Sequence, residues 1–165
     1  MNAAFTPIDP NTFRAAMGCF LTGVTIVTTV GRRGMAGLTA NSFTSVSLDP
    51  CKILVCIKSQ SATGITIRES LKFAVNFLSA GQGDLASRFA KPFDDRFAGV
   101  EYARDENGLP LLTGSLAHIV CALDRIYESG DHDIFIGDVL ACASASGKPL
   151  AFFQGKMCDY VNSTN

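Results

Sequence analysis

The sequence lacks the residues that a metal centre or a disulfide framework needs. Histidine occurs only at His118 and His132, and none of the six cysteines belongs to a CxxC pair. Neither histidine lies at metal-ligand spacing from a cysteine, so we expect no zinc site. Most of the cysteines lie in apolar runs, as Cys56 does within residues 53–57. We interpret them as small buried hydrophobic residues in a reducing compartment.

The chain also lacks an excess of either charge and any long apolar run. It has 14 Lys and Arg residues against 15 Asp and Glu residues, a net charge of -1. A broad nucleic-acid surface needs clustered positive charge, so we expect no nucleic-acid partner. No secretory hydrophobic region follows Met1, and no apolar run is long enough to span a bilayer. We therefore expect no membrane contact and a cytoplasmic location.

Common catalytic motifs are missing as well. The sequence contains no GxGxxG, GxxxxGK[ST], GxSxG or HExxH motif. Nothing in it indicates a serine or cysteine nucleophile with its own base. If the chain is an enzyme, we expect a cofactor to carry the difficult chemistry.

The residues that are present predict one packed, mainly β domain over residues 1–165. Hydrophobic residues make up 47% of the chain and charged residues 18%, which is typical of a globular protein. Helices are predicted over 10–20, capped by Asp9, over 61–70, capped by Ser61, and over 84–90. Strands are predicted over residues 24–30, 35–43, 52–57, 73–78, 117–128, 133–143 and 150–153. Their hairpin-like spacing favours an antiparallel barrel or sandwich over a doubly wound parallel sheet.

A polar, β-rich stretch over residues 37–50 is the first candidate binding segment. Its small hydroxyl and amide side chains surround Phe43 and Val46. Small residues let a flat ligand approach the backbone, whose N–H groups then bond the polar edge of that ligand. The alternative interpretation is an ordinary edge strand and loop rich in Thr and Ser.

Two cationic segments are candidate phosphate sites. Lys58 precedes Ser61 and Thr63 at the predicted start of a helix, where an anion is favoured. Arg88 follows Ser87, and an arginine can bind a phosphate through two donors. The alternatives are a capped surface helix with a solvated lysine, and an arginine that makes a weak surface contact.

A histidine in a predicted turn is the candidate acid or ligand-orienting group. His132 lies between Asp131 and Asp133. Two neighbouring carboxylates favour the protonated imidazole, which can act as an acid or orient a charged or amide-bearing ligand. The alternative is a turn histidine that bonds its neighbours. We interpret His118, which lies within a β-rich run, as structural.

The order of these segments resembles the flavin reductase-like family, whose members adopt the FMN-binding split barrel. The matching pieces are residues 13–14, 22–29, 37–50, 74–79, 87–90, 96–100, 130–132 and 134–139. The resemblance covers nearly the whole chain, and its specificity comes from the ordered set. The chain is most similar to the small reductase components of two-component flavin-dependent monooxygenases. The resemblance implies a mainly β fold, an antiparallel Greek-key split β-barrel with a few short peripheral helices.

The resemblance also implies roles for particular residues. His132 would be the catalytic residue, near the nicotinamide. The flavin ring and ribityl chain would be lined by Thr39, Ala40, Asn41, Ser42, Ser45, Val46 and Ser47. The ribityl-phosphate side would be lined by Cys56, Ile57, Lys58, Ser61 and Thr63. Asn76, Phe77, Leu78 and Ser79 would approach the ring system, and Arg88 and Phe89 would complete the phosphate end.

The implied activity is hydride transfer from NADH or NADPH to FMN or FAD. The resemblance further implies a homodimer with two flavin sites near the subunit interface, and a separate oxygenase that uses the reduced flavin. Two alternatives stay open: a flavoprotein reductase of another acceptor, such as a cobalt corrinoid or a ferric complex, and a flavin-binding protein without turnover.

Overall fold

The computed structural model describes residues 7–92 and 95–159, which form three helices and twelve strands. The helices are α1 (Pro10–Gly18), α2 (Ala62–Ser70) and α3 (Gly83–Ala90). The strands are β1 (Thr22–Gly23), β2 (Thr25–Gly31), β3 (Gly34–Ala40), β4 (Phe43–Leu48), β5 (Cys51–Lys58), β6 (Lys72–Phe77), β7 (Tyr102–Arg104), β8 (Pro110–Leu112), β9 (Ala117–Ser129), β10 (His132–Ser144), β11 (Leu150–Phe153) and β12 (Lys156–Asp159).

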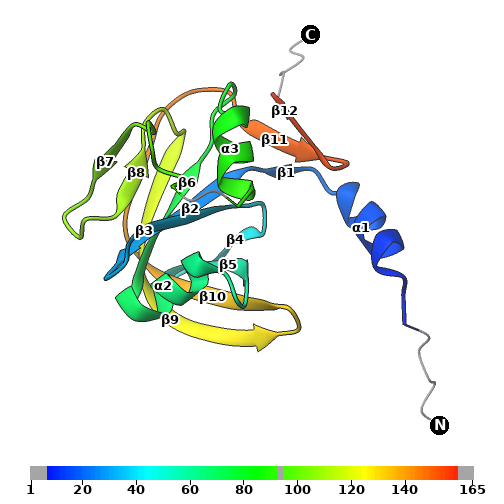
Figure 1. Cartoon of the computed structure of the whole chain (residues 1–165), viewed down its shortest axis with the longest axis horizontal. Helices are drawn as coiled ribbons and strands as arrows, with labels where there is room; N and C mark the ends of the chain where they lie inside the picture. The colour runs from blue at the N-terminus through cyan, green and yellow to red at the C-terminus, as the bar shows by residue number, and fades with distance from the viewer. Residues whose placement is uncertain (1–6, 93–94, 160–165) are drawn as a thin grey trace.

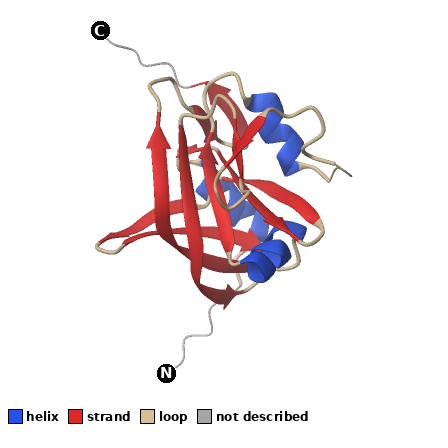
Figure 2. Cartoon of the chain, turned by 90° about the vertical axis from the view of Figure 1, so that its left-hand side faces the viewer, coloured by secondary structure: helices blue, strands red, loops and turns tan. Residues whose placement is uncertain are grey.

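A seven-stranded antiparallel sheet, in the order β3-β2-β6-β9-β10-β5-β4, forms most of the molecule. Its two edge strands, β3 and β4, are joined by residues 41–42 alone. Three Cα steps span at most about 11 Å, whereas the edges of a flat seven-stranded sheet lie about 28 Å apart. The sheet must therefore curl until its edges come close at this link, and Figure 2 shows the curled strands. No β3–β4 ladder joins them among the described residues, and the predicted mainly β, antiparallel split barrel is confirmed.

Three hydrophobic clusters form the core of the described residues, and two of them lie on opposite faces of β2. Inside the curled sheet, Val27 packs with Val55 and Phe135, and Ile67 of α2 closes one end. On the outer face, Ile26 belongs to the cluster that packs under α3. Strand β2 is therefore buried on both faces, and its β-branched run, which predicted a strand, is also suited to dense packing.

The helix caps follow the predicted chemistry. The Asp9 carboxylate accepts a hydrogen bond of 2.9 Å from the Thr12 N–H, and the Ser61 hydroxyl accepts one of 3.1 Å from the Gly64 N–H. The predicted helices are confirmed, although α1 ends at Gly18. Helix α1 stands away from the body of the molecule as an arm (Figure 1). None of the described helices has the length and apolar character that crossing a bilayer requires.

The structure corrects two expectations. The predicted strand over 35–43 is interrupted at residues 41–42, where the chain passes from one sheet edge to the other, and the polar residues after it form β4. The interpretation of most cysteines as buried is wrong: Cys121 is buried and Cys56 is half-buried, and the other four are exposed. An apolar run does not ensure burial when one face or end of a strand meets solvent, as in the last residues of β10.

Candidate functional site

Two cavities meet at the junction between the sheet edges. The polar cleft, of about 420 Å³, is lined by Leu38, Thr39, Ala40, Asn41, Ser42, Cys56, Ile57, Lys58, Ser61, Ala62, Phe89, Ala90, Arg96 and His132. The apolar groove, of about 730 Å³, is lined by Met17, Phe20, Leu21, Thr22, Gly23, Val24, Thr25, Asn41, Ser42, Phe43, Thr44, Leu54, Cys56, Phe77, Leu78, Leu116, Pro149 and Leu150. Asn41, Ser42 and Cys56 line both and form the wall between them.

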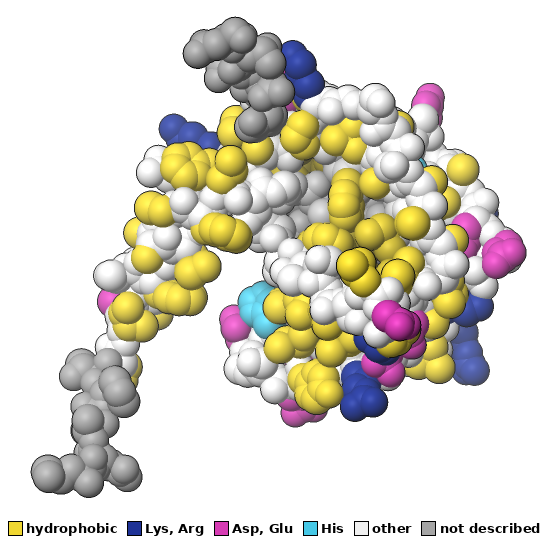
Figure 3. Space-filling model, turned by 180° about the vertical axis from the view of Figure 1, so that it is seen from behind, with side chains coloured by type: hydrophobic (Ala, Val, Ile, Leu, Met, Phe, Trp, Pro, Cys, Tyr) yellow, Lys and Arg dark blue, Asp and Glu magenta, His cyan; other side chains and the backbone are white. Residues whose placement is uncertain are grey.

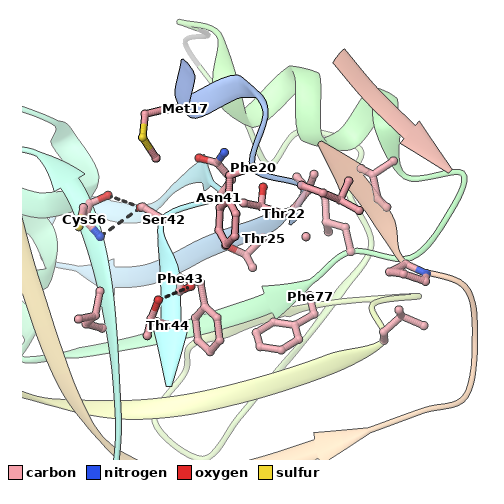
Figure 4. Close-up of a pocket in the computed structure, with 18 residues that line it drawn as sticks. Met17, Phe20, Thr22, Thr25, Asn41, Ser42, Phe43, Thr44, Cys56 and Phe77 are labelled. Atoms are coloured by element: carbon pink, nitrogen blue, oxygen red, sulfur yellow. Dashed lines mark hydrogen bonds between the residues drawn. The ribbon is translucent and has the colours of Figure 1, made fainter. Parts of the chain in front are cut away.

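The shared wall is held by a reciprocal pair of hydrogen bonds. The Ser42 hydroxyl donates to the Cys56 carbonyl at 2.8 Å and accepts from the Cys56 N–H at 3.1 Å (Figure 4). These bonds attach the β3–β4 link to β5 where the sheet is split. Burial raises the pKa of the Cys56 thiol, which disfavours the thiolate that a nucleophile needs. The wall therefore offers hydrogen-bonding groups rather than covalent chemistry.

The cationic end of the polar cleft is formed by Lys58, Arg96 and the start of α2. The Arg96 guanidinium donates to the Gly37 carbonyl at 2.7 Å and to the Lys91 carbonyl at 3.0 Å, so two backbone groups fix its place. Among the described residues, the buried hydroxyl of Thr63, in the first turn of α2, has no hydrogen-bond partner. Two cations and the free N–H groups of a helix start suit an anion such as a phosphate.

The floor of the polar cleft depends on a close approach between α3 and β3. The Phe89 ring packs so near Gly37 that a Cβ there would lie 2.8 Å from it. The Thr39 hydroxyl donates to the Ala86 carbonyl at 2.6 Å and fastens the same two elements. Glycine at position 37 is therefore required by packing, and it also presents the carbonyl that positions Arg96.

His132 borders the polar cleft beside Lys58, its Cα partner in the β5–β10 ladder. The His132 Nδ1 lies 2.8 Å from the Asp131 carboxylate, and the hydrogen bond from His132 lowers the pKa of that carboxyl. This contact occupies Nδ1 and leaves Nε2 for a ligand. The expectation that two carboxylates flank the imidazole is corrected. Successive side chains alternate along a strand, so Asp133 turns to the other face and bonds Ser59 and Arg68 instead.

Ten of the predicted site residues meet in the polar cleft: Thr39, Ala40, Asn41, Ser42, Cys56, Ile57, Lys58, Ser61, Phe89 and His132. Phe77 and Leu78 line the apolar groove instead, where the Phe77 ring makes an edge contact with Phe43 at 4.8 Å between centroids. Ser45, Val46 and Ser47 lie on β4 and border neither cavity.

The remaining predicted residues line neither the polar cleft nor the apolar groove. Asn76 is fully buried, and its side chain bonds Ile26, Thr28, Leu112 and His118. The Ser79 hydroxyl donates to the Gly114 carbonyl. Thr63 adjoins the polar cleft from a smaller cavity of about 150 Å³ that also contains Arg96. Arg88 lines a separate cavity of about 320 Å³ with Asp84 and Glu101.

Arg96 is the principal cleft residue that the sequence reasoning missed. It lies in a loop after α3, far in sequence from Gly37, the β3 residue that it bonds. Its segment belongs to the matching pieces of the family resemblance, which was the available signal. The role of a loop arginine can be inferred only when its backbone partners, here Gly37 and Lys91, are known.

The cleft residues fit a flat, phosphorylated heterocycle. One end carries the cations Lys58 and Arg96, and the orphan Thr63 hydroxyl lies at the smaller cavity that Arg96 also lines. The other carries the small side chains of residues 39–42, with backbone groups available for a polar edge. The isoalloxazine and phosphate of a flavin have these two chemistries, so Lys58, Arg96 and residues 39–42 would hold it.

Comparison with known proteins agrees with this fit. A relative from Rhizobium meliloti (strain 1021), the reductase subunit of stachydrine N-demethylase, is 40% identical over 148 residues, which cover 89% of this chain and 64% of that protein. The chain covers 48% of a second relative from the same organism, a probable flavin reductase. It therefore spans 64% of the length of the first relative and 48% of the length of the second.

Solved structures give the same result for the fold. Nitrilotriacetate monooxygenase component B from Mycobacterium thermoresistibile matches with a TM-score of 0.90 and 35% identity, covering 94% of this chain and 88% of that one. The NADH:FAD oxidoreductase of Streptomyces globisporus, in complex with NAD and FAD fragments, matches with a TM-score of 0.89 and 37% identity, covering 98% and 100%. Residues 17–160 match the flavin reductase like domain, and the chain belongs to that family.

Proposed function

We propose that this chain is an NAD(P)H-dependent flavin reductase that transfers a hydride from a dihydronicotinamide to FMN or FAD. The observation that carries the proposal is the polar cleft, in which Lys58 and Arg96 share one cavity with His132 and the small residues of β3. The Streptomyces globisporus relative, an NADH:FAD oxidoreductase with NAD and FAD fragments, supports both ligand classes.

Binding and orientation are the tasks of the protein in this reaction. A bound flavin supplies the hydride-accepting chemistry, so the residues contribute position and electrostatics. Lys58, Arg96 and the first turn of α2 hold the phosphate, and the backbone of residues 39–42 bonds the polar ring edge. The Phe89 ring and the Ser42–Cys56 pair keep the floor and wall of the cleft rigid.

His132 binds the nicotinamide donor at the mouth of the cleft. Asp131 holds Nδ1, so the ring is oriented and Nε2 is presented to a ligand such as a carboxamide. The side chain is about half exposed, which suits a donor that enters and leaves in each cycle. The flavin and the nicotinamide donor are thus bound by different parts of one cavity.

The proposal includes a homodimer and a separate oxygenase. No residue of α1 is buried, and Phe13, Met17 and Phe20 are 55%, 52% and 69% exposed. Figure 3 shows hydrophobic side chains along this arm and in the hollow beside it. A second copy of the chain would cover that surface. Relatives named as reductase subunits or components of monooxygenases support an oxygenase as the user of the reduced flavin.

The deciding experiment follows NADH absorbance in air with FMN, FAD or neither added, after a visible spectrum of the purified protein. Flavin-dependent loss of NADH is expected. The preferred flavin then limits the partner to oxygenases that use that flavin. Flavin binding without NADH oxidation would instead indicate a binding protein. The variant His132→Ala should lower kcat/KM for NADH by about 3- to 10-fold, the value of one hydrogen bond, and leave the Kd for flavin unchanged. An unchanged kcat/KM contradicts the role of His132.

A further inference from the structure

Asp133 is the one charged side chain that is buried among the described residues, with 3% of its surface exposed. The Ser59 hydroxyl donates to its Oδ1 at 2.9 Å, and the Arg68 guanidinium donates to its Oδ2 at 2.6 Å. Arg68 also lies over the Phe135 ring, 5.3 Å from its centroid. Both carboxylate oxygens are therefore engaged, on the core side of β10 and away from the polar cleft.

The partners of Asp133 belong to the elements that carry the cleft residues. Ser59 follows Lys58 directly, Arg68 lies in the last turn of α2, and Asp133 follows His132. The Ser59 N–H also donates to the Asp131 carbonyl at 3.2 Å. One buried carboxylate thus joins the end of β5, the start of β10 and the helix whose first turn faces the anion end of the cleft.

We propose that Asp133, through Ser59 and Arg68, is a positioning residue that fixes the 130–132 turn over the cleft and thereby determines the KM for NAD(P)H. The inference rests on the proposed reductase function. Buried ion pairs contribute little net stability compared with apolar packing, and one of their attested uses is to specify a unique arrangement. Here the arrangement specified is that of His132 beside Lys58.

A second ion-pair cluster provides a matched control on the same two strands. Lys52 bonds Asp124 and Asp138 at the other end of the β5–β10 ladder. It is more exposed than Asp133 and borders neither the polar cleft nor the apolar groove. Asp138→Asn therefore removes one charge from β10 without touching the segment that carries His132.

The test compares Asp133→Asn, Ser59→Ala and Asp138→Asn in steady-state assays of NADH oxidation with saturating flavin. Asp133→Asn should raise the KM for NADH by about 3- to 10-fold, no more than the loss of the His132 hydrogen bond itself, with kcat within twofold of the original. Ser59→Ala keeps the ion pair and should raise KM about threefold, so the proposal stays testable if Asp133→Asn fails to fold. Asp138→Asn should leave KM unchanged.

A double variant separates positioning from general destabilisation. If Asp133 acts through His132, adding Asp133→Asn to His132→Ala should change KM no further, because the group that it positions is already absent. Additive effects on KM, or an unchanged KM in folded Asp133→Asn and Ser59→Ala proteins, would overturn this inference and leave the proposed reductase function standing. An original chain that oxidises no NADH with either flavin would overturn the reductase function, and this inference with it.

Discussion

The polar cleft and the apolar groove share a wall but differ in how complete they are within one chain. The cleft is built from groups that hydrogen bonds already fix, including Arg96, Ser42 and the cap of α2. The groove is bordered at one end by residues near α1, a nine-residue helix with no buried side chain. Isolated helices of that length are marginal in water. We therefore propose that the cleft binds a small molecule and that a protein surface covers the groove.

The largest effect should be a loss of stability on replacing Asn76, a fully buried residue that lines neither cavity. Asn76→Ala leaves the Leu112 N–H and the His118 ring without their acceptor, and the Ile26 carbonyl without a donor. Leaving these buried groups without hydrogen-bond partners should lower the free energy of unfolding by about 3 kcal/mol. Urea denaturation measures this loss. If Asn76 instead contacts the flavin, the Kd for FMN of the folded variant will rise; we expect no change.

Asn76 also illustrates why the site could be predicted only in part. The apolar run over 73–78 indicated a strand, but it did not reveal which alternate side chains face inward. A shift of one residue reverses every face, and in the structure Phe77 reaches the groove while Asn76 is buried. Arg88 and Phe89 differ in the same way on α3: Phe89 forms the cleft floor, and Arg88 points to another cavity.

Other features were predictable because they depend on local chemistry. The caps at Asp9 and Ser61 follow from side chains that bond the first turn of a helix. The β-branched run over 24–30 became β2. Strand β4 was harder to predict, because an edge strand rich in Ser and Thr is exposed along most of its length and carries no clear alternation. Of the polar stretch over residues 37–50, only residues 38–42 line the cleft.

The next largest effect should be a loss of flavin affinity on replacing a residue of the polar cleft. Lys58→Met removes a cation from the anion end and should raise the Kd for FMN about 10- to 100-fold, the range of a charge-assisted hydrogen bond. Flavin fluorescence quenching measures it, and the difference should shrink at high salt. Lys52→Met, at the opposite end of β5, is the control and should leave the Kd unchanged. Equal Kd values for the two variants would mean that the phosphate is bound elsewhere.

A smaller effect should be confined to the groove. Phe20→Asp places a charge on the exposed apolar arm and should weaken self-association by about tenfold or more, as when an interface anchor is lost. Sedimentation at several concentrations measures the change. Because Phe20 is 69% exposed, the midpoint of unfolding of the monomer should not fall. A variant with the association constant of the original chain would remove Phe20 from the proposed interface.

The smallest effect concerns His118, the half-buried histidine of the Asn76 network. Its Nδ1 donates to the Asn76 Oδ1 at 2.9 Å, because the Asn76 amide nitrogen faces the Ile26 carbonyl. Burial lowers the pKa of His118 from its ordinary value of 6.5, so the unfolded chain takes up the proton first. The free energy of unfolding should therefore be fully retained above pH 6.5 and decline as the pH falls below it.

Urea denaturation of the original chain and of His118→Gln, at several values between pH 5.5 and 7.5, tests this dependence. Glutamine can still donate to Asn76 but does not titrate, so the decline should be shallower in the variant. The carboxyls with lowered pKa values, Asp9, Asp124 and Asp131, titrate below this window and cannot supply the slope. An identical slope in both proteins would show that His118 is not its source. Flavin affinity should be the same in both, since His118 borders neither the polar cleft nor the apolar groove.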